Sequence, residues 1–393
     1  MPTTEPRRPK VATSEVVRDI NRRVLLNLIR TRQPLSRADL ARFSGLQRST
    51  VSLIVEELVD DRWVLEGPTG RLPRGRRPTY LRLNDQRVIV GIYIRPIQTT
   101  IALADVNGRF TSREVMPTPA GPKAAVDELA ARARKLIRSC SGKKVEGIGV
   151  SLPGRIERGS GKLVFAPNLK WPEYDIRGPL EEAAGLGVEI ENAANACVLA
   201  AVWFDHIESR NMVVVTVSEG IGTGILVNGE LVRGLSGLAC EFGHVPLDLN
   251  GPVCSCGSRG CWEVFASNRA ALRYYRESTA QPEGLTFGDL LDLAERDDAH
   301  AVQALETMAR YLGRGMRMLV AGMDPEQILV VGDLTRSWNR VGPIVQAEVQ
   351  AQVLPGGLVP RLVPVHEGGM ARLRGAIALV LQKHFGAVAQ AAA

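Results

Sequence analysis

The most informative segment of the chain runs from Glu241 to Glu263 and reads EFGHVPLDLNGPVCSCGSRGCWE. It holds one imidazole and three thiols, at His244, Cys254, Cys256 and Cys261. One nitrogen and three sulfur ligands complete the tetrahedral shell of a structural zinc ion. Incidental buried cysteines are the alternative, but glycines beside the thiols supply the freedom to turn all three toward one ion. We therefore predict a structural Zn²⁺ site, which leaves both glutamates available for another role.

Length and composition bound the class of protein. A chain of 393 residues suggests two or three domains, and 45% hydrophobic with 23% charged residues is globular. No apolar run approaches the ~20 residues that span a bilayer. The first ten residues lack the apolar core of a secretory signal. Thiols grouped as metal ligands fit a reducing compartment. We expect a cytoplasmic protein with no membrane contact.

The positive charge is concentrated at the N-terminus. The formal net charge is +7, and residues 1–87 hold 18 basic and 10 acidic side chains, which gives +8. The remainder holds 49 − 18 = 31 basic and 42 − 10 = 32 acidic side chains, which gives −1. A basic module attached to a neutral body is typical of a nucleic-acid reader with a separate sensing domain. A solvated basic tail is the alternative, which the helical pattern below argues against.

Residues 1–83 carry the pattern of a winged helix-turn-helix. A first helix is predicted from apolar residues at helical spacing, namely Val16, Ile20, Val24, Leu25, Leu28 and Ile29. The run Ser36–Asp39 reads as a capping box that opens a second helix, which ends at Ser44-Gly45. A third helix begins near Gln47, and after an arginine-rich loop Thr79–Leu83 alternates like a strand.

We expect this module to bind a double-stranded DNA operator through the third helix and the loop, which is the wing. The candidate contacts on the helix are Gln47, Arg48, Ser49, Thr50 and Ser52. The candidate contacts on the wing are Arg74, Arg76 and Arg77, with Arg71 nearby. A dimer would read a roughly palindromic site. Three-helix modules also serve as protein-docking units, and that alternative stays open.

The rest of the chain predicts an α/β fold, in two lobes. Strand-like runs lie at 88–94, 101–108, 145–151, 212–217 and 328–332. Helical stretches lie between them, at 124–137 and 301–320. The first two strand-like runs suggest a hairpin. Alternation of strands and helices is typical of an α/β sheet with helices packed on it.

These features resemble the ROK family of repressors, open reading frames and kinases, in the branch that carries an N-terminal winged helix. The most specific likeness is Glu-x-Gly-His followed by Cys-x-Cys-Gly-x-x-Gly-Cys-x-Glu. The resemblance implies an actin-like, two-lobed sugar-kinase (ribonuclease H-like) fold with a sugar in the cleft between the lobes. The expected domains are the winged helix at 1–83, a first lobe at 84–205 with a C-terminal helix at about 372–393, and a zinc-containing second lobe at 206–371.

Against the kinases of that family, the sequence departs at four places. The glycine turn that holds ATP phosphates is replaced by Tyr93–Ile97, in which Pro96 removes a backbone donor. The general base of the Glu-Asn-Asp motif is replaced by Ala193. A second phosphate loop carries Glu219, and a Gly-Gly pair near the adenosine is Gly332-Asp333. We therefore expect no catalytic residues and no sugar phosphorylation.

The sugar side of the motif is better preserved. The resemblance assigns hydroxyl binding to Asn192, Glu241, His244 and Glu263, with help from Asn168 and Gly154. A zinc ion on one nitrogen of His244 would fix its tautomer and leave the other nitrogen to face the ligand. The alternative is that Asn192 and the two glutamates only support the zinc site.

Together these features predict a sugar-responsive transcriptional repressor that binds a neutral sugar or sugar derivative and forms a homodimer or homotetramer. One alternative is an ATP-dependent sugar kinase that also binds DNA, for which Glu191 or Asp205 would have to act as the base. Another is a regulator controlled by a protein partner, with a vestigial cleft.

Overall fold

The computed structural model describes residues 13–69, 78–157, 159–205, 207, 209–237, 239–279, 284–351, 356–366 and 368–386. The chain divides into two compact units, Met1–Asp85 with Gln382–Ala393, and Gln86–Leu381. Within the described residues, no helix combines the length and the apolar character needed to cross a membrane. The predicted wing arginines Arg71, Arg74, Arg76 and Arg77 lie outside the described residues.

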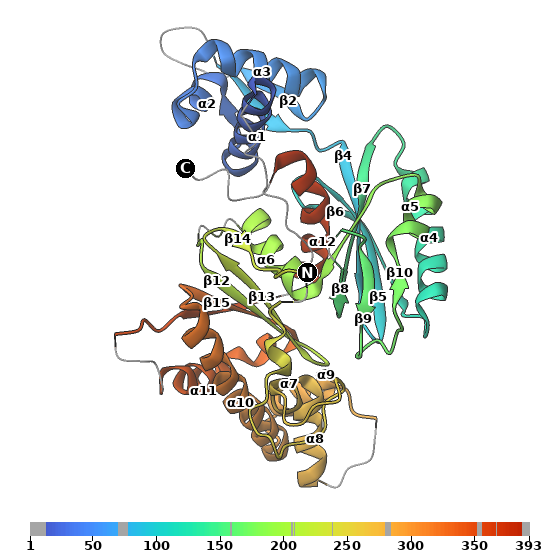
Figure 1. Cartoon of the computed structure of the whole chain (residues 1–393), viewed down its shortest axis with the longest axis vertical. Coiled ribbons are helices and arrows are strands. Elements are labelled where there is room, and N and C mark those ends of the chain that lie inside the picture. The colour runs from blue at the N-terminus through green and yellow to red at the C-terminus, as the bar shows by residue number, and fades with distance from the viewer. Residues whose placement is uncertain are drawn as a thin grey trace, which may run out of the picture. The chain divides into compact units, whose positions relative to one another are not determined.

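The first unit carries helices α1 to α3 and a small antiparallel sheet of order β1-β3-β2 (Figure 1). The elements are α1 (Ser14–Arg32), β1 (Leu35–Ser36), α2 (Arg37–Ser44), α3 (Arg48–Asp60), β2 (Val64–Thr69) and β3 (Thr79–Leu83). The predicted capping box is confirmed, because Ser36 Oγ accepts from Asp39 N at 3.2 Å and Asp39 Oδ2 accepts from Ser36 N at 3.1 Å. Helix α2 ends at Gly45, whose φ of 70° is left-handed.

The predicted helix α1 is present, and only the later part of its apolar face is buried. Leu25, Leu26 and Ile29 are fully buried, but Val16 and Ile20 are 46% and 41% exposed. Helical spacing shows which residues share one face of the helix. It does not show which turns of that face are covered by other elements. The end of the chain also packs here, since Asn27 Nδ2 donates to the carbonyl of Phe385 at 2.8 Å.

The second unit contains two large sheets. The first has the order β11-β7-β4-β5-β6, in which β4 and β5 form the predicted hairpin and β7 and β11 run parallel to β4. Its elements are β4 (Arg87–Ile94), β5 (Gln98–Asp105), β6 (Phe110–Pro117), α4 (Pro122–Ser139), β7 (Lys144–Leu152), α5 (Arg177–Ala184), β11 (Val188–Asn192) and α6 (Ala193–Phe204). A small sheet of β8 (Arg155–Ile156), β9 (Lys162–Phe165) and β10 (Tyr174–Asp175) is inserted before α5.

The second large sheet has the order β14-β13-β12-β15-β16. Its elements are β12 (Met212–Val217), β13 (Ile221–Val227), β14 (Glu230–Leu231), η1 (Phe242–His244), α7 (Trp262–Ala266), α8 (Asn268–Thr279), α9 (Phe287–Glu295), α10 (Ala299–Met323), β15 (Gln327–Val331), η2 (Asp333–Ser337), α11 (Trp338–Gln350), β16 (Arg361–Val365) and α12 (Gly368–Phe385). The predicted strands and helices of both sheets are therefore present, with ends shifted by a few residues.

The faces of β4 follow the period of two of a strand. Val88, Val90 and Ile92 share a core with α4 and α5. The opposite face carries Gly91 and Tyr93. A Cβ on Gly91 would meet the Ile377 side chain of α12 at 2.7 Å, so glycine permits this close approach.

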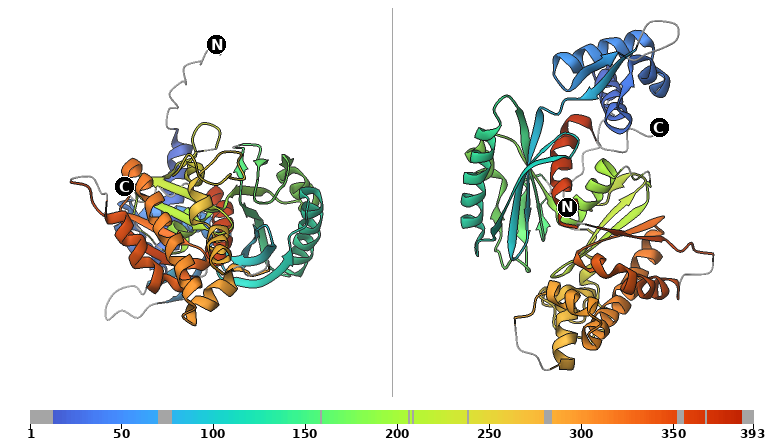
Figure 2. Two further views of the ribbon diagram at one scale, coloured as in Figure 1. Left: turned by 90° about the horizontal axis from the view of Figure 1, so that it is seen from below. Right: turned by 180° about the vertical axis from the view of Figure 1, so that it is seen from behind.

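Helices α6 and α12 lie between the two large sheets (Figures 1 and 2). They touch at Gly375, where a Cβ would meet the carbonyl oxygen of Ala196 at 2.0 Å. Residues 193–203 of α6 are all buried, as expected of a helix that is covered on every side. The outer face of the second sheet packs on α10 and α11. The result is an α/β unit of two lobes, one built on each sheet.

Candidate functional site

A cavity opens between the two lobes of the second unit. Strand ends from both sheets surround it: Arg95 follows β4, Gly154 follows β7 and Asn192 closes β11, while the β12–β13 turn supplies residues 218–220. Carboxyl ends of parallel strands are where open α/β sheets bind ligands. All six residues predicted to bind hydroxyls line this cavity, namely Gly154, Asn168, Asn192, Glu241, His244 and Glu263.

Asn192 is held by the backbone on both sides of its amide. Its Oδ1 caps α6 by accepting from Ala194 N at 2.8 Å, and its Nδ2 donates to the Gly154 carbonyl at 2.8 Å. Gly154 has a φ of 122°, and a Cβ there would lie 2.5 Å from the Phe165 carbonyl oxygen. Asn168 accepts from Arg269 at 3.0 Å. Asn192 keeps one N–H for a ligand, in a fixed direction.

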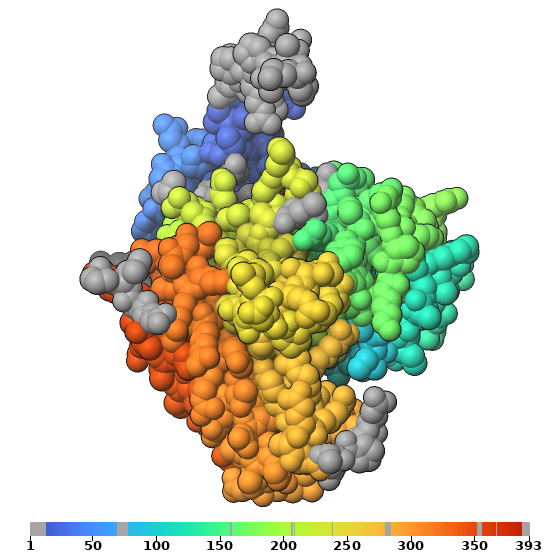
Figure 3. Space-filling model, turned by 60° about the horizontal axis from the view of Figure 1, so that its bottom comes forward, coloured from blue at the N-terminus to red at the C-terminus, as the bar shows by residue number. Residues whose placement is uncertain are grey.

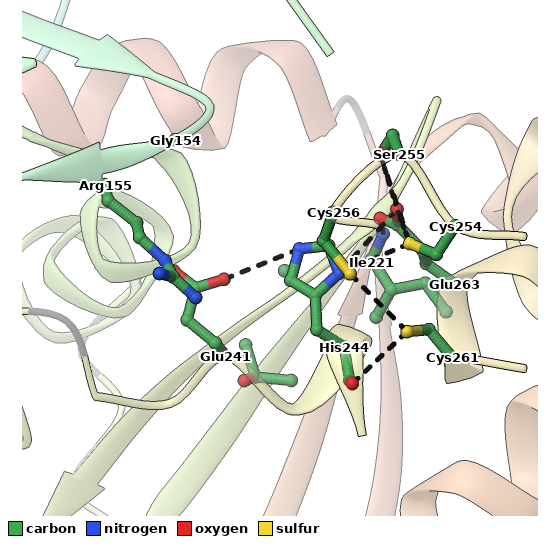
Figure 4. A network of polar contacts seen from close by, with 12 residues as sticks. Gly154, Arg155, Ile221, Glu241, His244, Cys254, Ser255, Cys256, Cys261 and Glu263 are labelled. Carbon is green, nitrogen blue, oxygen red and sulfur yellow. Dashed lines mark hydrogen bonds and ion pairs between the residues drawn. The ribbon is translucent and has the colours of Figure 1, made fainter. Parts of the chain in front are cut away.

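Glu241 faces the cavity with few protein partners (Figure 4). Its Oε1 lies 3.9 Å from Arg155 Nε, and its Oε2 lies 3.9 Å from His244 Nε2. Neither distance is a hydrogen bond, so both oxygens can accept from ligand hydroxyls. Burial raises the pKa of the Glu241 carboxyl. A carboxylate with open acceptor sites in a partly dry cavity suits a polyol.

His244 joins this cavity to the cluster of thiols. Its Nδ1 lies 3.5 Å from Cys254 Sγ, on the side opposite the Nε2 that faces Glu241. The donor atoms of His244, Cys254, Cys256 and Cys261 all lie within 4.8 Å of one another. Figure 3 shows the segment around residue 250 (yellow) at the surface of the unit.

Two of the donor distances match those around a tetrahedral zinc ion. Bonds of about 2.3 Å to sulfur and 2.0–2.1 Å to nitrogen place two sulfurs about 3.8 Å apart and sulfur and nitrogen about 3.6 Å apart. The Cys256 to Cys261 sulfur distance is 3.8 Å, and the Cys254 sulfur to His244 Nδ1 distance is 3.5 Å. Burial raises the pKa of the Cys254 and Cys261 thiols. A cation in the cluster would therefore be needed to hold them as thiolates.

Glu263 contacts the cluster at Cys254 (Figure 4) and also lines the cavity. Its Oε1 lies 3.1 Å from Cys254 Sγ and accepts from Ser255 Oγ at 3.2 Å. Its Oε2 accepts weakly from Ile221 N at 3.4 Å. The residue thus supports the cluster with one oxygen and turns the other toward the cavity, so the two roles weighed from the sequence are compatible.

Three of the four places where the sequence departs from the kinase pattern also line the cavity, the exception being Gly332-Asp333. Ala193 opens α6 beside Asn192. Arg95, from the β4–β5 turn of the first lobe, reaches two carboxylates of the second lobe: Glu219 Oε1 at 3.3 Å and Asp333 Oδ2 at 3.7 Å. The negative charge that Glu219 brings to the second phosphate loop is therefore paired with an arginine.

The sequence also missed residues that belong to the cavity. Arg155, Arg372 and Tyr93 line it, and none was a predicted contact. Arg155 lies next to Gly154 and was within reach of motif reasoning. Arg372 comes from the helix at the far end of the chain, where no local pattern marks it.

The predicted DNA-contacting residues lie at the start of α3 in the first unit. Gln47 is the N-cap of α3 and makes no side-chain capping bond. Gln47, Arg48 and Ser49 are exposed, and Thr50 and Ser52 are half-buried. The opposite face holds Val51, Ile54, Val55 and Leu58 in the core. The polar residues are thus accessible.

Comparison with known proteins identifies the family. The ROK family sequence profile matches residues 89–383. The xylose repressor of Bacillus spizizenii is 31% identical over 383 residues, which cover 95% of this chain and 98% of the repressor. A glucokinase of Streptomyces griseus, solved with glucose and AMPPNP, matches with 27% identity and a TM-score of 0.67, over 74% of this chain and 97% of its own.

The first unit is included in the match to regulators. The crystal structure of a ROK family transcriptional regulator, a homologue of the E. coli MLC protein, has a TM-score of 0.78 and 24% identity, and it covers 94% of this chain and 99% of its own. The likeness to regulators therefore extends over both units, and this chain belongs to the ROK family, on the repressor branch.

Proposed function

We propose that this protein is a sugar-responsive, DNA-binding transcriptional repressor whose ROK domain binds a sugar without phosphorylating it. The observation that carries the proposal is the composition of the cavity. It gathers six hydroxyl-binding candidates around one space, and Ala193, which by resemblance stands where the kinases carry their base, lines the same space. The whole-length similarity to a xylose repressor supports the same function.

The sugar would be held by the carboxylate acceptors and by the histidine beside them. Glu241 and Glu263 accept hydroxyl protons, and carboxylate acceptors make stronger hydrogen bonds than neutral groups. A metal ion bound to His244 Nδ1 leaves Nε2 to carry the ring proton, so the imidazole donates toward the ligand. The residues that would hold Zn²⁺ are His244, Cys254, Cys256 and Cys261, and its role there is structural because protein fills all four positions.

Phosphoryl transfer lacks a base. Glu191 is engaged with Arg233 at 2.9 Å and with Asn195 at 3.1 Å, and it is not part of the cavity wall. Asp205 ends α6, a full helix away from Ala193, and lies 4.0 Å from Arg374. Neither carboxylate replaces the missing aspartate, which disfavours the kinase alternative.

DNA binding is assigned to the proposed domain at 1–83. The exposed start of α3 offers Gln47, Arg48, Ser49, Thr50 and Ser52 to a major groove, and the arginines of 70–77 add a basic wing by sequence. The domain at 84–205, with the C-terminal helix, and the domain at 206–371 would close on the sugar. A homodimer or homotetramer in the cytoplasm would read two half-sites of an operator, and sugar would alter operator affinity by linkage.

The test is a thermal-shift screen of the full-length protein against xylose, glucose, N-acetylglucosamine, mannose and fructose. One sugar should raise the melting temperature and change operator affinity. Glu241→Gln should weaken that sugar's affinity about 10- to 150-fold, the value of one charge-assisted hydrogen bond. Glu230→Gln is the matched control, because Glu230 is exposed on β14 and does not line the cavity.

One result would overturn the sugar assignment. If no sugar or sugar phosphate shifts stability at tens of millimolar, the regulator with a protein effector becomes the better interpretation.

A further inference from the structure

Arg372 is a buried cation in the wall of the cavity. It lies in the second turn of α12 and is 4% exposed. Its Nη1 donates to the Gly368 carbonyl at 3.3 Å, and its guanidinium lies 5.5 Å from the ring centroid of Tyr93. Its Nη2 is buried and has no hydrogen-bond partner among the described residues. One end of this charged guanidinium is thus buried without a hydrogen-bond acceptor.

Two carboxylates of the second lobe pair with a different arginine. Glu219 and Asp333 both pair with Arg95, which lines the same cavity. Arg95 Nε is also buried without a partner in the described part of the chain. This end of the cavity therefore holds two guanidinium groups and presents buried N–H donors that nothing in the described chain accepts from.

Such an arrangement is costly without a ligand. A buried charge without a matched partner loses several kcal/mol of hydration that nothing replaces. Buried unsatisfied donors in native proteins often mark the place of an ion or a functional group. The guanidinium fork matches the oxygens of phosphate better than any neutral group does.

Tyr93 adds a further donor. Its side chain lines the cavity beside both arginines, and burial raises the pKa of its phenol, so the hydroxyl stays protonated. The part of the cavity beside His244 carries Glu241 and Glu263, which accept from hydroxyls and would repel an anion. The cavity thus combines donors from β4 and α12, at Tyr93, Arg95 and Arg372, with two carboxylate acceptors, of which Glu241 lies 3.9 Å from Arg155 Nε.

We propose that Arg372, assisted by Arg95, binds the phosphate group of a phosphorylated sugar whose hydroxyls lie at the glutamate end. This inference rests on the proposed function, because it assigns the chemical class of the ligand of the same cavity. It has one mechanical consequence. A phosphate on Arg95 competes with Glu219 and Asp333, so ligand binding would loosen a contact between the two lobes.

Calorimetric titration of the full-length protein tests the assignment. The ligands are glucose, glucose 6-phosphate, xylose, xylose 5-phosphate, inorganic phosphate and ADP. At least one sugar phosphate should bind about 10- to 150-fold more tightly than its parent sugar, the value of one charge-assisted bond. Inorganic phosphate and ADP should bind more weakly than that sugar phosphate, since neither offers sugar hydroxyls on the glutamate side.

Variants distinguish phosphate binding by Arg372 from a general effect of positive charge on the protein. Arg372→Gln should bring the ratio of the two dissociation constants close to one, and Arg372→Lys should keep part of the preference. Arg374→Gln is the matched control, on the same helix with a side chain 39% exposed and outside the cavity, and should leave the ratio unchanged. If Arg372→Gln does not fold, the ratio of the two dissociation constants is measured with Arg372→Lys, in which it should fall.

Three results overturn the inference. They are equal affinity of the wild type for every sugar and its phosphate, an undiminished preference for the sugar phosphate in a folded Arg372→Gln or Arg372→Lys, and tighter binding of free phosphate or ADP than of any sugar phosphate. If neutral sugars bind and phosphorylated ones do not bind better, the proposed function stands and only this subsite fails.

Discussion

Gly220 lies in the cavity wall, where a Cβ added by substitution with alanine would be too close to neighbouring side chains. A Cβ on Gly220 would lie 2.4 Å from Glu263 Oε2 and 2.7 Å from Asn168 Nδ2, well inside ordinary contact distance. Both atoms are the ends of side chains, so the side chains would move and the backbone would stay. Gly220 has no left-handed φ, so alanine is compatible with its backbone. Gly220→Ala therefore displaces two proposed sugar contacts together.

The loss of sugar-binding free energy can be estimated from those two hydrogen bonds. A hydrogen bond to the Glu263 carboxylate contributes about 1.5–3 kcal/mol and one to the Asn168 amide about 1 kcal/mol. Their sum of about 2.5–4 kcal/mol corresponds to a sugar affinity about 60- to 700-fold weaker. Operator affinity without sugar should not change, because the substitution lies in the second unit and the reading residues lie in the first.

Isothermal titration with the sugar that gives the largest thermal shift measures the first effect, and fluorescence anisotropy with operator DNA measures the second. Gly121→Ala is the control, since its φ is −126° and a Cβ there meets nothing within 4 Å. Wild-type sugar affinity in a folded Gly220→Ala protein would refute the assignment of Glu263 and Asn168 to the ligand.

Three further predictions concern the metal, the chemistry and the DNA. Purified protein should contain about one zinc ion per chain by metal analysis, and Cys256→Ser should lower the melting temperature by about 5 °C or more, since a structural zinc ion contributes directly to folding. A coupled assay should detect no ATP-dependent phosphorylation of glucose, xylose or N-acetylglucosamine, and turnover of about 1–10³ per second would restore the kinase alternative. Arg48→Ala should weaken specific operator binding by about 1–3 kcal/mol in a gel-shift titration, whereas Arg76→Ala should weaken all DNA binding and reduce its salt dependence.

Local signals predicted the elements well. The Ser36 and Asp39 capping box and the left-handed Gly45 were readable because each depends on residues within one turn of the others. Strand β4 was readable because its apolar run is short, continuous and followed by a second run after a turn. The exposure of Val16 and Ile20 was not predictable from the helical spacing, because it depends on where other elements stop.

The cavity was predictable only where a family motif marked it. Asn192, Glu241 and Glu263 carry that motif, so their presence in one cavity was expected. From the sequence, Arg95 was interpreted only as part of the segment that replaces the glycine turn. Its contact with Glu219 was not predicted, because the two residues are 124 positions apart. Side-chain partners at that separation depend on the register of whole lobes, and one sequence does not encode them in any local pattern.

The proposed loss of catalysis and the gain of charge at this cavity would together fit one requirement. A sensor must leave its ligand unchanged, so that occupancy reports concentration and not the history of turnover. Ala193 removes the base, and Arg95 fills the turn where ATP phosphates would lie while joining the two lobes through Glu219. Differential contacts of this kind are what a ligand needs in order to shift a two-state equilibrium. A ligand that merely filled the glutamate end would leave the Arg95 bridge intact, whereas one that also reached Arg372 would act on the bridge itself.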